Sequence, residues 1–349
     1  MNINAWENVL EKGLSESAFP CYAAAVGRGN DVFFKKTGGK RACFPEPLPL
    51  TDDTLFDMAS LSKLIGTTMA ALRMIERKEL HLDDKLDKFF ESCHGKENIT
   101  IRHLMTHTSG IASFFNMWKM GISPDDAHSV ILSYPLAAPT GTRVIYSCMG
   151  YILLGKILER ICASSLDDIV RKEVTAPLEM DRTVYCPTSN SCCVTTEKKI
   201  NSDGYICGRV HDENADFLGG VSGNAGLFAP FDDVIKFAKM LSFRGKGYLK
   251  QETFDMAVTD LTCKIPGGAR GLGFQLYRSE AFPAGSKMSP GSYGHTGFTG
   301  TSLYVDNDTG VYCILLTNRV HFGRDTEAFF KYRTLFYDTV FSDIRECLK

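Results

Sequence analysis

The 349-residue sequence lacks several features that point to particular classes of protein. It has no basic excess, because 39 Lys and Arg oppose 41 Asp and Glu, which argues against nucleic acid or an anionic membrane surface as partner. No apolar run approaches the roughly 20 residues of a membrane span. Residues 1–7 show no basic patch followed by an apolar stretch, so we expect a cytoplasmic protein whose partner is a small molecule. The oligomeric state stays open.

Metal-binding patterns are also missing. The sequence contains neither an HExxH motif nor a CxxC pair, so we expect no metal and no other cofactor. Twelve cysteines are present, but they are scattered and several lie in apolar segments, which favours reduced thiols over disulfides. His103 and His107 stand four residues apart without an evident third ligand, and we interpret both as structural.

What the sequence does contain is a strand-rich beginning and end around a helical middle. Alternation predicts strand hairpins over 21–35 and 301–317, whereas helical periodicity marks 3–10, 60–75, 151–161 and 329–340. We therefore expect an α/β domain over 1–58 and 245–349, with an antiparallel sheet built from both termini and flanked by helices. A mainly helical, all-α domain over 59–244 is inserted into it, with the active site at the junction.

The strongest chemical signal is the pair Ser60 and Lys63 at the start of a predicted helix. Residues at i and i+3 share a helical face, so the amine can reach the hydroxyl. Serine is a weak nucleophile until a base takes its proton, and a partly desolvated lysine with a lowered pKa can do so. The spacing predicts Ser60 as nucleophile and Lys63 as its activating partner. Taken alone, however, SxxK is a weak pattern that a solvated Ser and Lys often produce.

Further motifs follow in order: IRHLMTHTSGI over 101–111, Tyr146-Ser147-Cys148, and His295-Thr296-Gly297. With SxxK before them, the chain resembles the serine β-lactamase and penicillin-binding-protein superfamily. It is most similar to the class C β-lactamases and the related esterases and D-peptidases. The resemblance implies a β-lactamase-like fold, in which the 101–111 segment is chiefly scaffold.

The resemblance also implies roles for residues after the nucleophile helix. Tyr146 would assist proton transfer beside Lys63, and Cys148 stands where the family has asparagine. A thiol is a poor donor, so the exchange weakens recognition of a substrate amide. The alternative is that Tyr146 is a core aromatic and Cys148 a packing residue.

His295, Thr296 and Gly297 match the family's triplet on the strand lining the active site. By resemblance, His295 and Thr296 would contact the substrate's carboxylate or acyl group, and a backbone N–H of this strand would complete an oxyanion hole with that of Ser60. Unperturbed histidine titrates near ~6.5, so a charge on His295 is expected to depend on pH. The alternative is a glycine-rich strand start without a catalytic role. A second triplet, residues 36–38 (KTG), precedes the nucleophile and is predicted to form a turn.

Two other segments resemble a subgroup of these hydrolases. His211, Asp212 and Glu213 could belong to a substrate-facing loop or to an ordinary capped loop. Arg319, just after a predicted strand, could bind a carboxylate bidentately or brace the domain junction.

The sequence therefore predicts a serine hydrolase that acts through an acyl-enzyme on a small amide or ester, of the cell-wall peptide or ester type. Hydrolysis of β-lactam rings is the alternative reaction. The alternative of another class is a non-catalytic paralogue that binds penicillin or muropeptides.

Overall fold

The computed structural model describes residues 1–188, 192–198, 204–278, 282–325 and 327–347. Its central sheet has seven strands in the order β3-β2-β1-β12-β11-β10-β9. Every neighbouring pair is antiparallel. The strands are β1 (Cys21–Arg28), β2 (Asp31–Ala42), β3 (Leu48–Pro49), β9 (Gln275–Leu276), β10 (Tyr293–Thr296), β11 (Ser302–Val305) and β12 (Val311–Thr317). Because β1 pairs with β12, the two ends of the chain meet in one sheet, as predicted.

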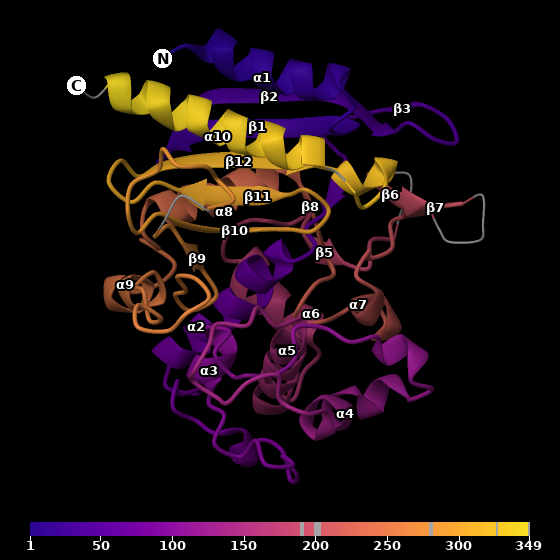
Figure 1. The fold of residues 1–349 in the computed structure, drawn as a ribbon, viewed down its shortest axis with the longest axis vertical. Helices are drawn as coiled ribbons and strands as arrows, with labels where there is room; N and C mark the ends of the chain where they lie inside the picture. The colour runs from indigo at the N-terminus through magenta and orange to yellow at the C-terminus, as the bar shows by residue number, and fades with distance from the viewer. Residues whose placement is uncertain (189–191, 199–203, 279–281, 326, 348–349) are drawn as a thin grey trace.

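Both faces of this sheet are covered, which explains why β1 is buried along nearly its whole length. Side chains alternate between the faces of a strand. Tyr22 and its alternating neighbours join a core with α1 (Ile3–Ser15) and α10 (Glu327–Cys347), and Ala23 belongs to the larger core on the other face. Figure 1 shows α1 and α10 side by side along the top of the sheet. On the second face, α8 (Phe231–Ser242) packs against β12.

The two terminal helices largely follow the predicted periodicity. Trp6 and Leu10 of α1 are buried, but Ile3 is 38% exposed because it begins the helix beyond the edge of the core. The apolar stripe predicted for the closing helix is buried in α10 along its whole length. The KTG triplet at 36–38 lies inside β2 and not in a turn, because the hairpin closes earlier, at Gly29 and Asn30.

Below the sheet in Figure 1 lies a mainly helical region. Its α-helices are α2 (Met69–Glu76), α3 (Ile101–Met105), α4 (Ala127–Ser133), α5 (Cys148–Cys162), α6 (Leu166–Val170), α7 (Glu213–Phe217) and α9 (Gln251–Ala257). Two short sheets accompany them: β4 (Leu55–Asp57), β8 (Leu227–Pro230) and β5 (Val184–Tyr185) form one, and β6 (Thr195–Lys198) and β7 (Tyr205–Cys207) the other. The helix predicted from Ser60 begins with a π-helical stretch, η1 (Lys63–Thr68), before it becomes α2. Such stretches are frequent at functional sites.

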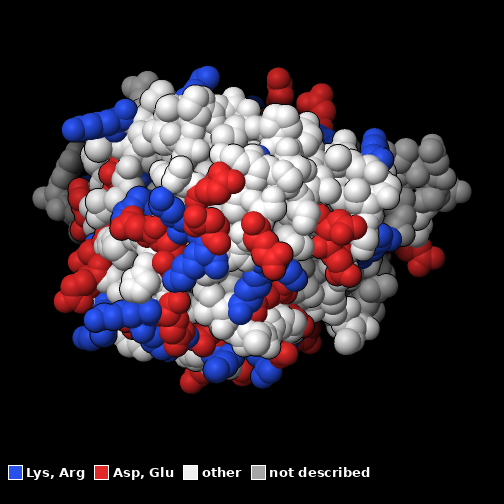
Figure 2. Space-filling model, turned by 90° about the horizontal axis from the view of Figure 1, so that it is seen from below, with Lys and Arg blue, Asp and Glu red and all other residues white. Residues whose placement is uncertain are grey.

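The division at residue 244 stays a prediction, and α8 within the proposed helical insert packs on the central sheet. No helix in the described part of the chain is long and apolar enough to cross a membrane. Figure 2, which views the molecule from its helical end, shows acidic and basic side chains intermixed over that face.

Candidate active site

Ser60 lies just beyond β4, in a sharp turn held by the buried carboxylate of Asp57. Asp57 Oδ1 accepts a hydrogen bond from the Ala59 N–H at 2.8 Å, and Oδ2 accepts one from the His211 N–H at 2.7 Å. Burial raises the pKa of Asp57. Ala59 has a φ of 45°, a left-handed conformation that non-glycine residues rarely adopt. The surrounding hydrogen bonds hold that conformation and fix the backbone that carries the half-buried Ser60.

Lys63 is fully buried one turn after Ser60. Its Nζ donates to Ser60 Oγ at 2.9 Å and to the carbonyl oxygen of Asn224 at 2.7 Å. Burial lowers the pKa of Lys63, but its interactions with Cys148 and Tyr146 outweigh this effect, so the pKa is raised overall. The lowered pKa expected from the sequence is therefore wrong, and at rest the amine keeps its proton.

Tyr146 lies beside this amine, with Lys63 Nζ 5.1 Å from the centroid of its ring. Its Oη is buried and makes no hydrogen bond of standard geometry with the described residues, but it lies close enough to Ser60 and Lys63 to interact with both. Burial raises the pKa of the phenol. The His107 ring lies 4.6 Å from the Tyr146 ring, and His107 Nδ1 accepts a hydrogen bond from the Ser147 N–H at 3.1 Å. His107 thus holds the segment that carries Tyr146, which is a structural role as predicted.

Cys148 begins α5, directly after Ser147, whose hydroxyl accepts a hydrogen bond from the Gly150 N–H and caps the helix. The Cys148 N–H donates to the carbonyl oxygen of Ser113 at 2.9 Å. This start of α5 places the thiol near Lys63.

The end of β10 is tied to the nucleophile turn by side chains that follow it. Thr299 Oγ1 donates to the carbonyl oxygen of Asp57 at 2.7 Å, and Thr301 Oγ1 to that of Met58 at 3.1 Å. At Gly297 a Cβ atom would come within 3.0 Å of both Thr301 and Met58, so only glycine allows this approach. The predicted triplet at 295–297 therefore lies beside Ser60.

His295 is 3% exposed, and its protonation state differs from the expected one. Its Nδ1 donates to the carbonyl oxygen of Thr296 at 2.7 Å, and its Nε2 is buried without a partner among the described residues. Burial, assisted by the positive charges of Arg270 and Lys63, lowers the pKa of His295 to about 3. The expectation of a charge that changes near neutral pH is wrong: His295 is a neutral hydrogen-bond acceptor.

Two cavities meet at Ser60, and Ser60, Tyr146 and Phe298 line both. The first, here the β10 cavity, has a volume of about 320 Å³. Its other lining residues are Arg270, Gln275, His295, Thr296, Gly297, Arg319, Phe330 and Arg333. The second, here the α7 cavity, has a volume of about 300 Å³ and is lined also by Ala59, Phe114, Asn116, Cys148, His211, Asp212, Glu213, Ala225 and Arg324. The structure thus places every predicted site residue except the buried Lys63 on a cavity wall, and Lys63 directly beneath Ser60.

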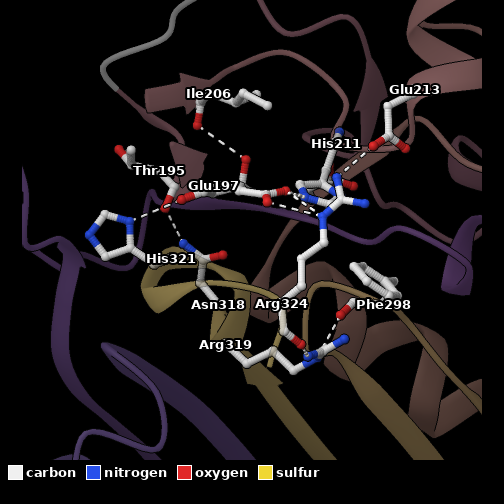
Figure 3. A network of polar contacts seen from close by, with 12 residues as sticks. Thr195, Glu197, Ile206, His211, Glu213, Phe298, Asn318, Arg319, His321 and Arg324 are labelled. Carbon is white, nitrogen blue, oxygen red and sulfur yellow. Dashed lines mark hydrogen bonds and ion pairs between the residues drawn. The ribbon is translucent and has the colours of Figure 1, made fainter. Parts of the chain in front are cut away.

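A network of ion pairs supports the wall of the α7 cavity (Figure 3). Arg324 Nε donates to both carboxylate oxygens of Glu197 on β6, at 3.0 and 2.9 Å, and its Nη2 to Glu213 on α7 at 2.5 Å. His211 Nε2 lies 2.7 Å from Glu197, and its ring stacks on Phe298. The network joins β6, α7 and the segment after β12 at one edge of the site.

Arg319 braces the same edge from below in Figure 3. Its Nε donates to the carbonyl oxygen of Phe298 at 2.8 Å and its Nη1 to that of Arg324 at 3.1 Å. The guanidinium also lies 4.6 Å from the centroid of the Phe298 ring. Arg319 therefore supports the loop after β10 as well as lining the β10 cavity.

All of these residues fall within a match to a known protein family. Residues 6–334, nearly the whole chain, match the model of the family described as Beta-lactamase. The chain belongs to the beta-lactamase family.

Curated relatives of this beta-lactamase-family chain include an N-acetylmuramyl-L-alanine amidase of Bacillus subtilis strain 168, which is 30% identical over 79% of this chain and 70% of the relative. A protein of Escherichia coli strain K12, provisionally named a D-alanyl-D-alanine carboxypeptidase, is 27% identical over 90% and 82% of the two chains.

Solved structures show the same fold. EstCE1, described as a hydrolase with promiscuous acyltransferase activity, has a TM-score of 0.79 at 21% identity and covers 96% of this chain and 98% of its own. The octameric penicillin-binding protein homologue from Pyrococcus abyssi has a TM-score of 0.76 at 22% identity, over 98% and 78% of the two chains. The β-lactamase-like fold expected from the motifs is confirmed.

Sequence reasoning missed two arginines of this beta-lactamase-family site, Arg270 and Arg333. Arg333 follows Phe329 by four residues, so it lies on the apolar face of α10, and a charge on such a face was a usable signal. Arg270 lies in an irregular segment before β9, where no local pattern marks it.

Proposed function

We propose that the protein is a serine hydrolase that cleaves a small amide or ester through an acyl-enzyme formed on Ser60. The observation that supports this best is the 2.9 Å hydrogen bond between Lys63 Nζ and Ser60 Oγ, at the point where two cavities meet. A carbonyl group placed at Ser60 could extend its two flanking groups in opposite directions, one into each cavity. Such positioning supplies much of the advantage of an enzyme over a reaction in solution.

In the proposed reaction Ser60 Oγ bonds to the carbonyl carbon, and its proton passes to the pair formed by Lys63 and Tyr146. The pair then delivers a proton to the leaving nitrogen or oxygen as the C–N or C–O bond breaks. Water hydrolyses the acyl-enzyme along the same proton path in reverse. The N–H groups of Ser60 and of the chain at the end of β10 would bind the oxyanion.

The resting protonation of Lys63 adds a condition to this mechanism. Lys63, Tyr146 and Ser60 must together release one proton before Ser60 can attack, because the amine is charged at rest. The charge of Lys63 also stabilises negative charge that develops on Ser60 Oγ. The reaction should therefore accelerate as pH rises.

Two observations favour a peptide amide or an ester over a β-lactam as substrate. The two relatives are named an amidase and a carboxypeptidase, both of which cleave amide bonds, and EstCE1 is described as a hydrolase with acyltransferase activity. In addition, Cys148 lines the α7 cavity where the family has asparagine, which removes an amide donor and acceptor from that wall. A β-lactamase activity is the second candidate.

The test compares the wild-type protein with Ser60→Ala, using the exposed Ser133→Ala as a matched control. All three proteins are incubated with a fluorescent fluorophosphonate, a fluorescent penicillin, nitrocefin, 4-nitrophenyl acetate and N-acetyl-D-alanyl-D-alanine. We expect labelling and turnover that depend on Ser60 and are unchanged in Ser133→Ala. Absence of both would overturn the proposal in favour of the non-catalytic binding role. Rapid hydrolysis of nitrocefin would instead assign a β-lactamase.

A further inference from the structure

The wall of the β10 cavity has a charge that the proposed hydrolysis does not require. Three arginines, Arg270, Arg319 and Arg333, line it, and none of its described lining residues is an Asp or Glu. A charge removed from water is costly unless an opposite charge accompanies it. A cavity whose wall carries three positive charges is therefore suited to an anionic ligand.

Arg270 and Arg333 lack a carboxylate partner in the described part of the chain. Arg333 is 8% exposed, and one of its nitrogens, Nε, donates to the carbonyl oxygen of Pro283 at 2.9 Å. Its two terminal nitrogens carry no hydrogen bond to the described residues. Arg270 is half-buried, and burial lowers the pKa of both guanidinium groups. An anion in the cavity would offset the cost of that desolvation.

These two arginines come from different elements and occupy different parts of the wall. The Arg270 guanidinium lies 5.5 Å from the centroid of the Tyr146 ring, next to Ser60. Arg333 extends from α10 and lies 5.2 Å from the centroid of the Phe330 ring, on the wall formed by that helix. The cavity therefore presents a positive group at its Ser60 end and another along α10.

Two uncharged groups complete this wall. Gln275 Oε1 accepts a hydrogen bond from Tyr304 Oη at 2.7 Å, which leaves the Gln275 amide nitrogen as a further donor at the cavity. His295 Nε2 is a buried acceptor without a partner among the described residues, so it can accept a hydrogen bond from a ligand. The site thus offers several donors, with His295 Nε2 as a buried neutral acceptor among them.

We infer that the β10 cavity binds a dianionic part of the substrate, with one carboxylate near Arg270 and Thr296 and a second at Arg333. The N–H of the scissile amide would donate to His295 Nε2. The substrate class is an acyl derivative of a dicarboxylic amino acid. The use of this site in turnover rests on the proposed function, but binding of the dianion does not involve Ser60 as a nucleophile.

Binding is tested with glutarate and glutaramate, which have the same length and differ by one negative charge. Titration calorimetry is performed on the wild type and on Ser60→Ala. Loss of a charge-assisted contact costs about tenfold in affinity, so we expect glutarate to bind at least about tenfold more tightly than glutaramate to both proteins. Arg333→Gln should remove this preference. Arg345→Gln, an exposed arginine on the same helix, should keep it.

Turnover is tested with N-acetyl-D-alanyl-D-glutamate and N-acetyl-D-alanyl-D-glutamine, and with the corresponding L-terminal peptides. We expect a higher kcat/KM for the glutamate member of a pair, lost in Arg333→Gln and retained in the exposed Lys264→Gln. Equal affinity for glutarate and glutaramate, or an equal loss in Arg345→Gln, would overturn the inference. Because the binding measurement uses Ser60→Ala, its outcome is independent of whether Ser60 is a nucleophile.

Discussion

The two cavities at Ser60 contrast in how their arginines are compensated. In the α7 cavity, Arg324 is paired with Glu197 and Glu213, so its charge is neutralised within the protein and braces the wall. In the β10 cavity, Arg270 and Arg333 have no carboxylate partner in the described part of the chain. An arginine whose charge is neutralised within the protein stabilises the fold, whereas an arginine without a carboxylate partner is available to bind a ligand.

The largest effect is expected where the two cavities meet. Lys63→Met keeps the volume of the buried side chain but removes its charge and proton, so kcat/KM on 4-nitrophenyl acetate should fall by about 10³-fold. Circular dichroism should show a retained fold, and the exposed Lys246→Met should behave as wild type. Because the pKa of Lys63 is raised, wild-type kcat/KM should rise toward alkaline pH. A variant with near wild-type activity would remove Lys63 from the mechanism.

The contrast between the cavities predicts different effects on stability. Arg324→Gln removes the ion pair of Glu213 and leaves Glu197 with His211 alone, and it should lower the free energy of unfolding by about 1 kcal/mol, since the 48% exposure of Arg324 screens its ion pairs. Arg333→Gln removes a buried, unpaired charge and should cost less or even stabilise. Urea denaturation measures both. A larger loss of stability in Arg333→Gln than in Arg324→Gln would show that the charge of Arg333 is compensated within the protein and that of Arg324 is not.

The stability difference caused by Arg324 should also depend on pH. Burial would raise the pKa of Glu197, but the hydrogen bonds from His211 and Arg324 outweigh it and lower the pKa overall. A carboxylate whose pKa is lower in the folded than in the unfolded protein stabilises the fold at pH values above its unfolded pKa. This contribution is lost as the pH falls through the folded pKa. The difference in the free energy of unfolding between wild type and Arg324→Gln should be largest near neutral pH and should disappear below about pH 4. A stability difference that stays constant with pH would contradict the role given to Glu197.

A smaller effect is expected at His295 in the β10 cavity. Its pKa of about 3 means that it stays neutral over the working range. His295→Gln replaces one neutral acceptor by another, so the pH profile of kcat/KM between about pH 5.5 and 8 should have the same shape as that of the wild type. If the wild-type profile has an inflection near 6.5 that disappears in the variant, then His295 does titrate.

The smallest effect is expected in the α7 cavity. Cys148→Asn introduces the amide that the family resemblance predicts at this position, and activity on amide substrates should rise a few-fold if the thiol is a functional loss. Kinetics on N-acetyl-D-alanyl-D-alanine measure this change. Unchanged or reduced rates would indicate that the thiol belongs to a differently arranged site.

The sequence by itself determined the elements and the order of the motifs. Strand alternation in β1 and β12, the apolar stripe of α10 and the three-residue spacing of Ser60 and Lys63 depend on near neighbours, so they are readable along the chain. The family resemblance added the expectation that the triplet at 295–297 would lie beside Ser60, and the structure places it there.

Only the tertiary structure decided the charges of the site. The Lys63 amine keeps its proton because Cys148 and Tyr146, far away in sequence, lie near it, and His295 loses its proton because it is buried near other cations. The meeting of Arg270 and Arg333 at one wall likewise depends on the packing of α10 near β10. A pKa depends on solvent exclusion and on charges brought together by folding, and neither is written in local sequence.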